Sequence, residues 1–244
     1  MQIDPKIKRF VLILIITFAC TFVRFFSEGP GLRFGWNQGR EVLTLLVAGK
    51  TIVLDPGHGG QDPGATSPYC EAEKDVVLKI ALYLKQFLEE SGANVILTRD
   101  GDYDLADNDR PRGVTRKRSD LEKRQKIVEE ANADLLVSIH VNSILSSRWS
   151  GAQTFYSAHL EENRLLAAII QDALKENLGG TKREAKDLDA YILRTSQVPA
   201  VLVEVGFISN PREGRLLGQA DYQRKVAYSI YKGISRYFGG QFRY

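Results

Sequence analysis

Polar side chains that suit catalysis occur where apolar segments of this 244-residue chain end. His58 follows the apolar and β-branched run Thr51–Leu54 within the stretch TIVLDPGHGG. His140 lies near the end of LLVSIHV, and Glu204 lies near the end of AVLVEV. Because ligands gather beyond the carboxyl ends of parallel strands, we expect these three side chains to project at one edge of a sheet.

Glu73 is placed beside them by helical spacing. Residues 73, 77, 80 and 84 differ by three or four positions, so they share one face of a helix. The carboxylate of Glu73 is therefore expected to point, with Val77, Ile80 and Leu84, towards the sheet. The alternative is that an acid in the first turn only complements the helix dipole.

Two histidines and a carboxylate form the donor set of an open zinc site. Imidazole and carboxylate both suit Zn²⁺, and three protein ligands leave a fourth position for water. The predicted ligands are His58, Glu73 and His140, and the glycines around His58 let the backbone fold around it. Glu204 is then left as the general base. The alternative for each histidine is an ordinary hydrogen-bonded residue of the core or of a loop.

The remaining histidine and the two cysteines carry weaker predictions. His159, in YSAHLEE, is expected to be a surface residue. Cys70 is either a further zinc ligand, because it lies in the same loop as Glu73, or a free thiol. Cys20 lies inside a strongly apolar run without access to Cys70, so no disulfide is expected.

Strands and helices alternate from Lys50 onward, which predicts one α/β domain. Apolar residues recur at helical spacing between Val76 and Leu88, and Gly92 then marks a stop. Further helices are predicted near 120–132 and 161–177, after an Asn210-Pro211 start signal, and at the end of the chain. The predicted strands cover residues 51–55, 94–98, 135–141 and 152–157. After the helix near 161–177, a lysine-rich linker leads to AYILR (190–194) and then to the strand at 200–205. This order predicts a mostly parallel or mixed twisted sheet with helices on both faces.

Residues 1–26 are predicted to be an export signal. Lys6, Lys8 and Arg9 precede FVLILIITFACTFV, which carries no charge until Arg24. This run is shorter than the ~20 residues that span a bilayer, but Arg24 can snorkel, and no A-x-A-like cleavage site follows. A membrane anchor is therefore favoured over a removed signal peptide, and either one places the rest of the chain outside the cytoplasmic membrane. Residues 27–49 are then a linker and residues 50–244 the catalytic domain.

The formal net charge of +3 and the isoelectric point of about 8.8 are mildly basic. They are too weak to indicate a nucleic-acid partner, and they are compatible with an acidic polymer as substrate. The run Arg110–Lys126 concentrates eight basic residues against two acidic ones. This basic run is interpreted as a solvated loop and helix face, with contact to an anionic polymer or a partner as the alternative.

Four segments resemble, in order and spacing, the zinc-dependent N-acetylmuramoyl-L-alanine amidases of bacterial cell walls. They are DPGHGGQDPGA (55–65), EKD (73–75), SIHVNS (138–143) and VEVGFISNP (203–211). The resemblance runs from about Lys50 to Phe238. Within the family, WSGAQTFYS (149–157) and SIYKGISRYF (229–238) are most similar to the germination-specific type of spore-forming bacteria.

The resemblance implies both a site and a reaction. His58, Glu73 and His140 match the family's zinc ligands, and Glu204 matches its catalytic glutamate. Such enzymes hydrolyse the amide between the lactoyl group of N-acetylmuramic acid and L-alanine in peptidoglycan. The germination-specific type acts in the spore cortex on the route to muramic-δ-lactam, together with a polysaccharide deacetylase, and depends on a helper protein.

Three other functions are weighed against the amidase. A noncatalytic wall-binding module is disfavoured because all four site residues are present. A nucleotide enzyme is disfavoured because DPGHGG fits neither the dinucleotide pattern nor the P-loop pattern. A general vegetative autolysin of the same family remains as the alternative biological role.

Overall fold

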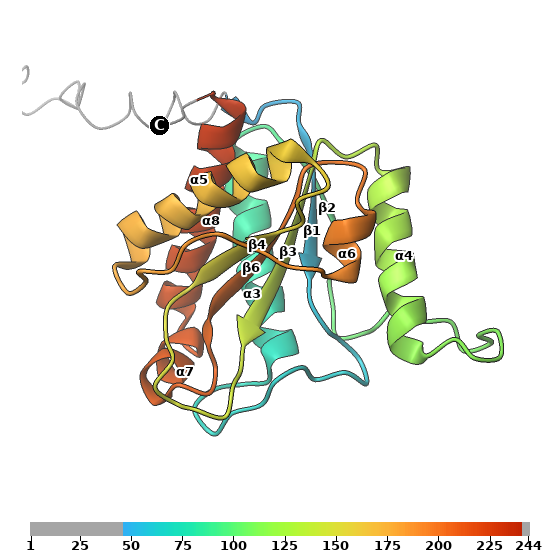
Figure 1. Ribbon diagram of the computed structural model, residues 1–244, viewed down its shortest axis with the longest axis horizontal. Helices are drawn as coiled ribbons and strands as arrows, with labels where there is room; N and C mark the ends of the chain where they lie inside the picture. Colours follow the sequence, from blue (N-terminus) through green and yellow to red (C-terminus); the bar gives the residue numbers. More distant parts are fainter. Residues whose placement is uncertain (1–45, 241–244) are drawn as a thin grey trace, which may run out of the picture. The chain divides into compact units, whose positions relative to one another are not determined.

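The computed structural model describes residues 46–240 of the chain (Figure 1). The predicted export signal, residues 1–26, lies outside the described residues, as does the predicted linker up to residue 45. Residues 241–244 are also not described. Within the described range, no helix combines the length and the apolar character that crossing a bilayer requires. The predicted boundaries at residues 26 and 49 stay predictions.

A six-stranded mixed sheet forms the centre of the described domain. Its strands, in chain order, are β1 (Thr51–Pro56), β2 (Asn94–Leu97), β3 (Leu135–Asn142), β4 (Gln153–Tyr156), β5 (Lys186–Asp187) and β6 (Ala200–Phe207). They lie side by side in the order β2-β1-β3-β6-β4-β5. The first four strands of this order pair in parallel, β4 pairs antiparallel with β6, and β5 pairs in parallel with β4. The predicted mostly parallel or mixed sheet is confirmed.

Helices cover both faces of this sheet (Figure 1). On one face, the larger hydrophobic core takes apolar side chains from α3 (Glu73–Glu90), α5 (Glu161–Leu178) and α8 (Ala220–Phe238). On the other face, a smaller core takes them from α4 (Arg116–Glu130) and α6 (Tyr191–Thr195). The short α7 (Pro211–Leu217) follows β6 and contacts both β6 and α8. The predicted single α/β domain with helices on both faces is thereby confirmed.

Burial on both faces of the sheet explains why the central strands consist almost entirely of apolar residues. In β3, Val137 faces the larger core while Leu136 faces the smaller one. In β6, Val203 and Leu202 divide between the two cores in the same way. Successive strand side chains point to opposite faces, so a strand covered on both sides is apolar throughout. A histidine or glutamate within such a strand is therefore an exception with a specific cause.

Two elements differ from the sequence prediction. The helix expected at 120–132 begins at Arg116, because the Thr115 hydroxyl caps it by accepting the backbone N–H of Arg118 at 3.1 Å. The two-residue β5 is not predicted, because the lysine-rich linker that contains it has no apolar alternation. The start signal at Asn210-Pro211 is confirmed, since the Asn210 side chain caps α7 and Pro211 is its first residue.

Candidate metal centre

His58 lies in the loop after β1 and has a backbone conformation that residues other than glycine rarely adopt. His58 has φ 61°, in the left-handed region. Two buried arginines bind the carbonyl groups around it. Arg99 donates to the carbonyls of Pro56 and Gly57, at 3.0 and 2.8 Å. Arg124 donates to the carbonyls of Pro56 and His58, at 2.8 and 2.6 Å. This hydrogen bonding fixes the loop from which His58 projects.

Arg124 is itself neutralised by a buried carboxylate. Its Nη1 lies 2.8 Å from Asp55 Oδ1, and only 1% of Arg124 and 2% of Asp55 is exposed. Asp55 also accepts hydrogen bonds from the hydroxyls of Ser138 and Thr98. Burial raises the pKa of Asp55, but the Arg124 charge and these hydroxyls outweigh it and hold that pKa below its ordinary value. Arg124 belongs to the basic run, and its sequence context gives no sign of this buried role.

Glu73 reaches the same edge of the sheet from the first turn of α3. Its side chain is buried, and the backbone N–H groups of Ala65 and Val141 donate to its carboxylate oxygens at 2.8 and 2.9 Å. Burial alone would raise its pKa, but hydrogen bonds with His140 and His58 hold the pKa of Glu73 well below its usual range. Glu73 is therefore ionised at neutral pH, which is the form that binds metals.

The side chains of His58, Glu73 and His140 converge in space. One donor atom from each lies within 4.8 Å of the other two. Glu73 Oε1 is 3.2 Å from His58 Nε2 and 3.1 Å from His140 Nδ1, and the two imidazole centroids are 5.0 Å apart. Ligands of a tetrahedral zinc ion at about 2.0–2.2 Å lie about 3.3–3.5 Å from one another. Glu73 Oε1 is therefore spaced from each imidazole nitrogen nearly as two zinc ligands are, and the set of donors suits a zinc ion.

Two glycines make room for these donors. A β-carbon at Gly57 would lie 2.2 Å from the His140 ring. At Gly64, where φ is 66°, a β-carbon would lie 2.6 Å from Glu73 Oε2 and 2.8 Å from His58 Cδ2. A side chain at either position would displace one of the three donors, because these separations are well inside van der Waals contact.

Asp62 orients His58. Its Oδ2 lies 2.8 Å from His58 Nδ1, which leaves Nε2 as the nitrogen that faces Glu73. Histidines that bind metals commonly donate their second N–H to a carboxylate, and this fixes the ring and its tautomer. Burial lowers the pKa of His58, but the carboxylates of Glu73 and Asp62 outweigh it and raise that pKa. Asp62 does not stand out in the sequence, because acids in glycine-rich loops are also typical of turns.

Glu204 lies beside the three donors without belonging to the group. In the parallel pair of β3 and β6 it is the register partner of His140. Its Oε2 is buried and has no hydrogen-bond partner among the described residues. Burial raises the pKa of Glu204 to about 7, although the neighbouring His140 opposes the shift. A carboxyl group that titrates near neutrality is suited both to accept and to donate a proton.

The other candidates from the sequence lie outside the group of three donors. His159 is exposed, as expected, and its Nε2 lies 2.8 Å from the carbonyl oxygen of Ser196. Cys70 is a half-buried free thiol and does not join the donors that could hold a metal in the described chain. Several cations of the basic run pair with nearby acids, as Arg116 does with Asp104 at 2.8 Å. The buried Arg124 is an exception to the predicted solvated face, whereas Lys126 of the same helix is exposed.

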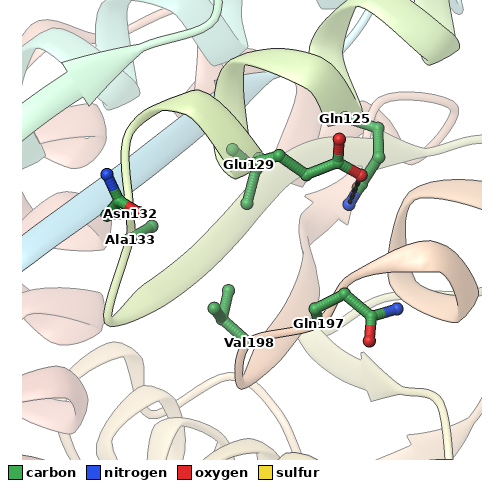
Figure 2. Close-up of a pocket in the computed structure, with 7 residues that line it drawn as sticks. Gln125, Glu129, Asn132, Ala133, Gln197 and Val198 are labelled. Carbon is green, nitrogen blue, oxygen red and sulfur yellow. Dashed lines mark hydrogen bonds between the residues drawn. The ribbon is translucent and has the colours of Figure 1, made fainter.

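A cavity of about 420 Å³ lies elsewhere in the domain, against α4. Figure 2 shows Gln125 and Glu129 of this helix in its lining, together with Ala133 and Val198. Ala133 precedes β3 and Val198 precedes β6, so the cavity borders the amino ends of these strands. The candidate metal centre lies at their carboxyl ends, and the cavity is therefore not part of it.

Comparison with known proteins identifies the family of the chain. The profile of the N-acetylmuramoyl-L-alanine amidase family matches residues 52–236, which include all four site residues. The chain belongs to this family of amidases. It is accordingly a hydrolase of an amide bond in the bacterial cell wall, with peptidoglycan as its substrate.

The similarity to individual amidases covers most of the chain. The germination-specific N-acetylmuramoyl-L-alanine amidase of Bacillus subtilis (strain 168) is 46% identical over 207 residues, which are 84% of this chain and 87% of that protein. The CwlD amidase from Clostridioides difficile, solved in complex with the GerS lipoprotein, has a TM-score of 0.74 and 41% identity, covering 79% of this chain and 100% of that chain. The catalytic domain of CwlV from Bacillus (Paenibacillus) polymyxa var. colistinus has a TM-score of 0.68 and 32% identity. The match covers 78% of this chain and 98% of that domain's chain. The family predicted from the motifs is confirmed.

Proposed function

We propose that this amidase is a zinc enzyme in which His58, Glu73 and His140 hold the ion and Glu204 transfers the proton. The observation that carries the proposal is the convergence of three metal-binding donors within 4.8 Å, beside a buried carboxyl group with an unpartnered oxygen. When bound, zinc would acidify a water molecule and polarise the carbonyl of the scissile amide. The bond cut is the amide between the lactoyl group of N-acetylmuramic acid and L-alanine.

Glu204 supplies both proton transfers. Its ionised carboxylate takes a proton from the attacking water while the new C–O bond forms. The protonated Glu204 then gives this proton to the L-alanine nitrogen as the C–N bond breaks, so the peptide leaves as an amine. Burial raises the pKa of this carboxyl group, which helps it to hold the proton until the leaving nitrogen takes it.

The proposed setting is the spore cortex, and the 46% identity to the germination-specific amidase of Bacillus subtilis supports it. Removal of stem peptides there would supply a polysaccharide deacetylase on the route to muramic-δ-lactam. We also propose a helper protein, because the similar CwlD amidase was solved in complex with the GerS lipoprotein. The leader would place the enzyme outside the cytoplasmic membrane, either anchored or secreted.

The test is to incubate the purified, zinc-loaded chain with cortex peptidoglycan and to measure two products. New α-amino groups of L-alanine should appear without new reducing sugar ends. Chelation should remove the metal and this activity together, and added zinc should restore both. Binding of peptidoglycan without amine release would favour the noncatalytic wall-binding module. Equal rates on cortex and vegetative wall would favour the general autolysin.

A further inference from the structure

The candidate site continues onto β4, the strand beside β6. Gln153 is the antiparallel register partner of Glu204. Residues directly opposite one another in antiparallel strands point to the same face, with β-carbons about 4.5–5.5 Å apart. Gln153 Oε1 accepts a hydrogen bond from Arg183 Nη1 at 3.0 Å. A guanidinium group therefore lies one side chain away from the proposed proton-transfer residue.

Arg183 is held by neutral groups. Its Nε donates to the carbonyl of Ser150 at 2.9 Å. The guanidinium carbon lies 4.6 Å from the ring centroid of Phe207 and 5.3 Å from that of Trp149. Within residues 46–240, Nη2 has no hydrogen-bond partner and Arg183 forms no ion pair with a carboxylate. A positive charge and one donor nitrogen are thus left for a ligand.

The segment that carries Arg183 is attached to its surroundings by its backbone as well. Gln171 Nε2 donates to the carbonyl of Arg183 at 2.9 Å, and Gln153 Nε2 donates to the carbonyl of Glu184 at 2.9 Å. The planar guanidinium is thereby oriented before any ligand arrives. A donor that is already in place loses less conformational entropy on binding, so its contribution to affinity is larger.

We infer that Arg183 binds a carboxylate of the stem peptide, on the residue that follows L-alanine. This inference rests on the proposed function, in which Glu204 protonates the L-alanine nitrogen. Each residue of an extended chain spans about 3.3–3.6 Å, so that carboxylate lies on the order of 7 Å from the scissile nitrogen. Gln153 alone separates Arg183 from Glu204, because its β-carbon lies about 4.5–5.5 Å from that of Glu204 and its Oε1 is 3.0 Å from Arg183 Nη1. Charge-assisted hydrogen bonds to guanidinium then select a free carboxylate over its uncharged amide.

The test uses two glycan-strand substrates that differ in one group. Both carry L-alanyl-D-glutamate stems on N-acetylmuramic acid, and in one the α-carboxylate of the glutamate is converted to the carboxamide. The zinc-loaded chain should show a kcat/KM at least about 10-fold higher on the carboxylate substrate. The Arg183→Gln variant should bring the ratio of the two kcat/KM values close to one, and Arg183→Lys should keep part of the preference.

The matched control is Arg224→Gln, which removes the same charge from an arginine of α8 whose guanidinium lies over Phe87, near the far end of α3. This variant should keep the ratio. If Arg183→Gln lowers both rates and keeps the ratio, its role is structural and the inference is wrong. Equal cleavage of the two substrates by the unmodified chain also overturns the inference but leaves the proposed function intact. Failure to cleave either substrate overturns the proposed function and the inference with it.

Discussion

Replacing Arg124 with methionine should destabilise the domain strongly, because it leaves a buried carboxylate without its counter-charge. Arg124 and Asp55 are almost completely buried and 2.8 Å apart. Removing one partner of such a pair costs about 3–5 kcal/mol of the free energy of unfolding. The carbonyls of Pro56 and His58 lose a donor as well. This loss is a large share of the ~5–15 kcal/mol that stabilises an ordinary domain.

Urea unfolding of the unmodified chain and of Arg124→Met measures this loss of stability. Lys126→Met, which removes an exposed cation from the same helix, is the control. The control should leave the midpoint unchanged. In the unmodified chain the pKa of Asp55 is lowered, so its contribution to stability is present above its unfolded value of ~3.9 and is lost as the pH falls through the lower folded value. Without Arg124, burial would raise this pKa, and the deficit should shrink on acidification. Loss of less than ~1 kcal/mol at pH 7, or a deficit that grows in acid, would refute the reasoning.

Three further outcomes are expected at the site itself. Gly57→Ala should abolish zinc binding and keep the circular dichroism spectrum of the folded domain, because the new β-carbon would lie 2.2 Å from the His140 ring. A Gly57→Ala variant that retains zinc would show that the new β-carbon does not displace this ring. Asp62→Asn should weaken zinc binding about 10–100-fold in a competition titration, since His58 loses the carboxylate that orients it; unchanged affinity would deny Asp62 that role. The acid limb of the rate profile should lie no higher than about 7, because burial raises the pKa of Glu204 to about 7 and the zinc charge opposes this rise. An acid limb well above 7 would contradict Glu204 as the base.

The strand-end residues are predictable from sequence for a physical reason. Strands buried on both faces are apolar throughout, so His140 and Glu204 stand out within β3 and β6. Glu73 is predictable from helical spacing, because it shares one face of α3 with apolar residues that pack on the sheet. The residues that hold the site in place are not predictable in this way, because partners distant in the chain define their roles. Arg124 lies 69 residues from Asp55, and Arg183 lies 30 residues from Gln153.

The central claim is that Glu204 moves the proton while three other residues hold zinc. The most direct measurement is the rate of L-alanine amine release from peptidoglycan by Glu204→Gln, with zinc content determined on the same sample. Glutamine keeps the size and hydrogen bonding of glutamate but cannot transfer the proton, so turnover should fall at least ~10²-fold with zinc retained. His140→Ala, measured in parallel, should lose zinc. Cleavage by Glu204→Gln at a near-normal rate with zinc bound would contradict the account.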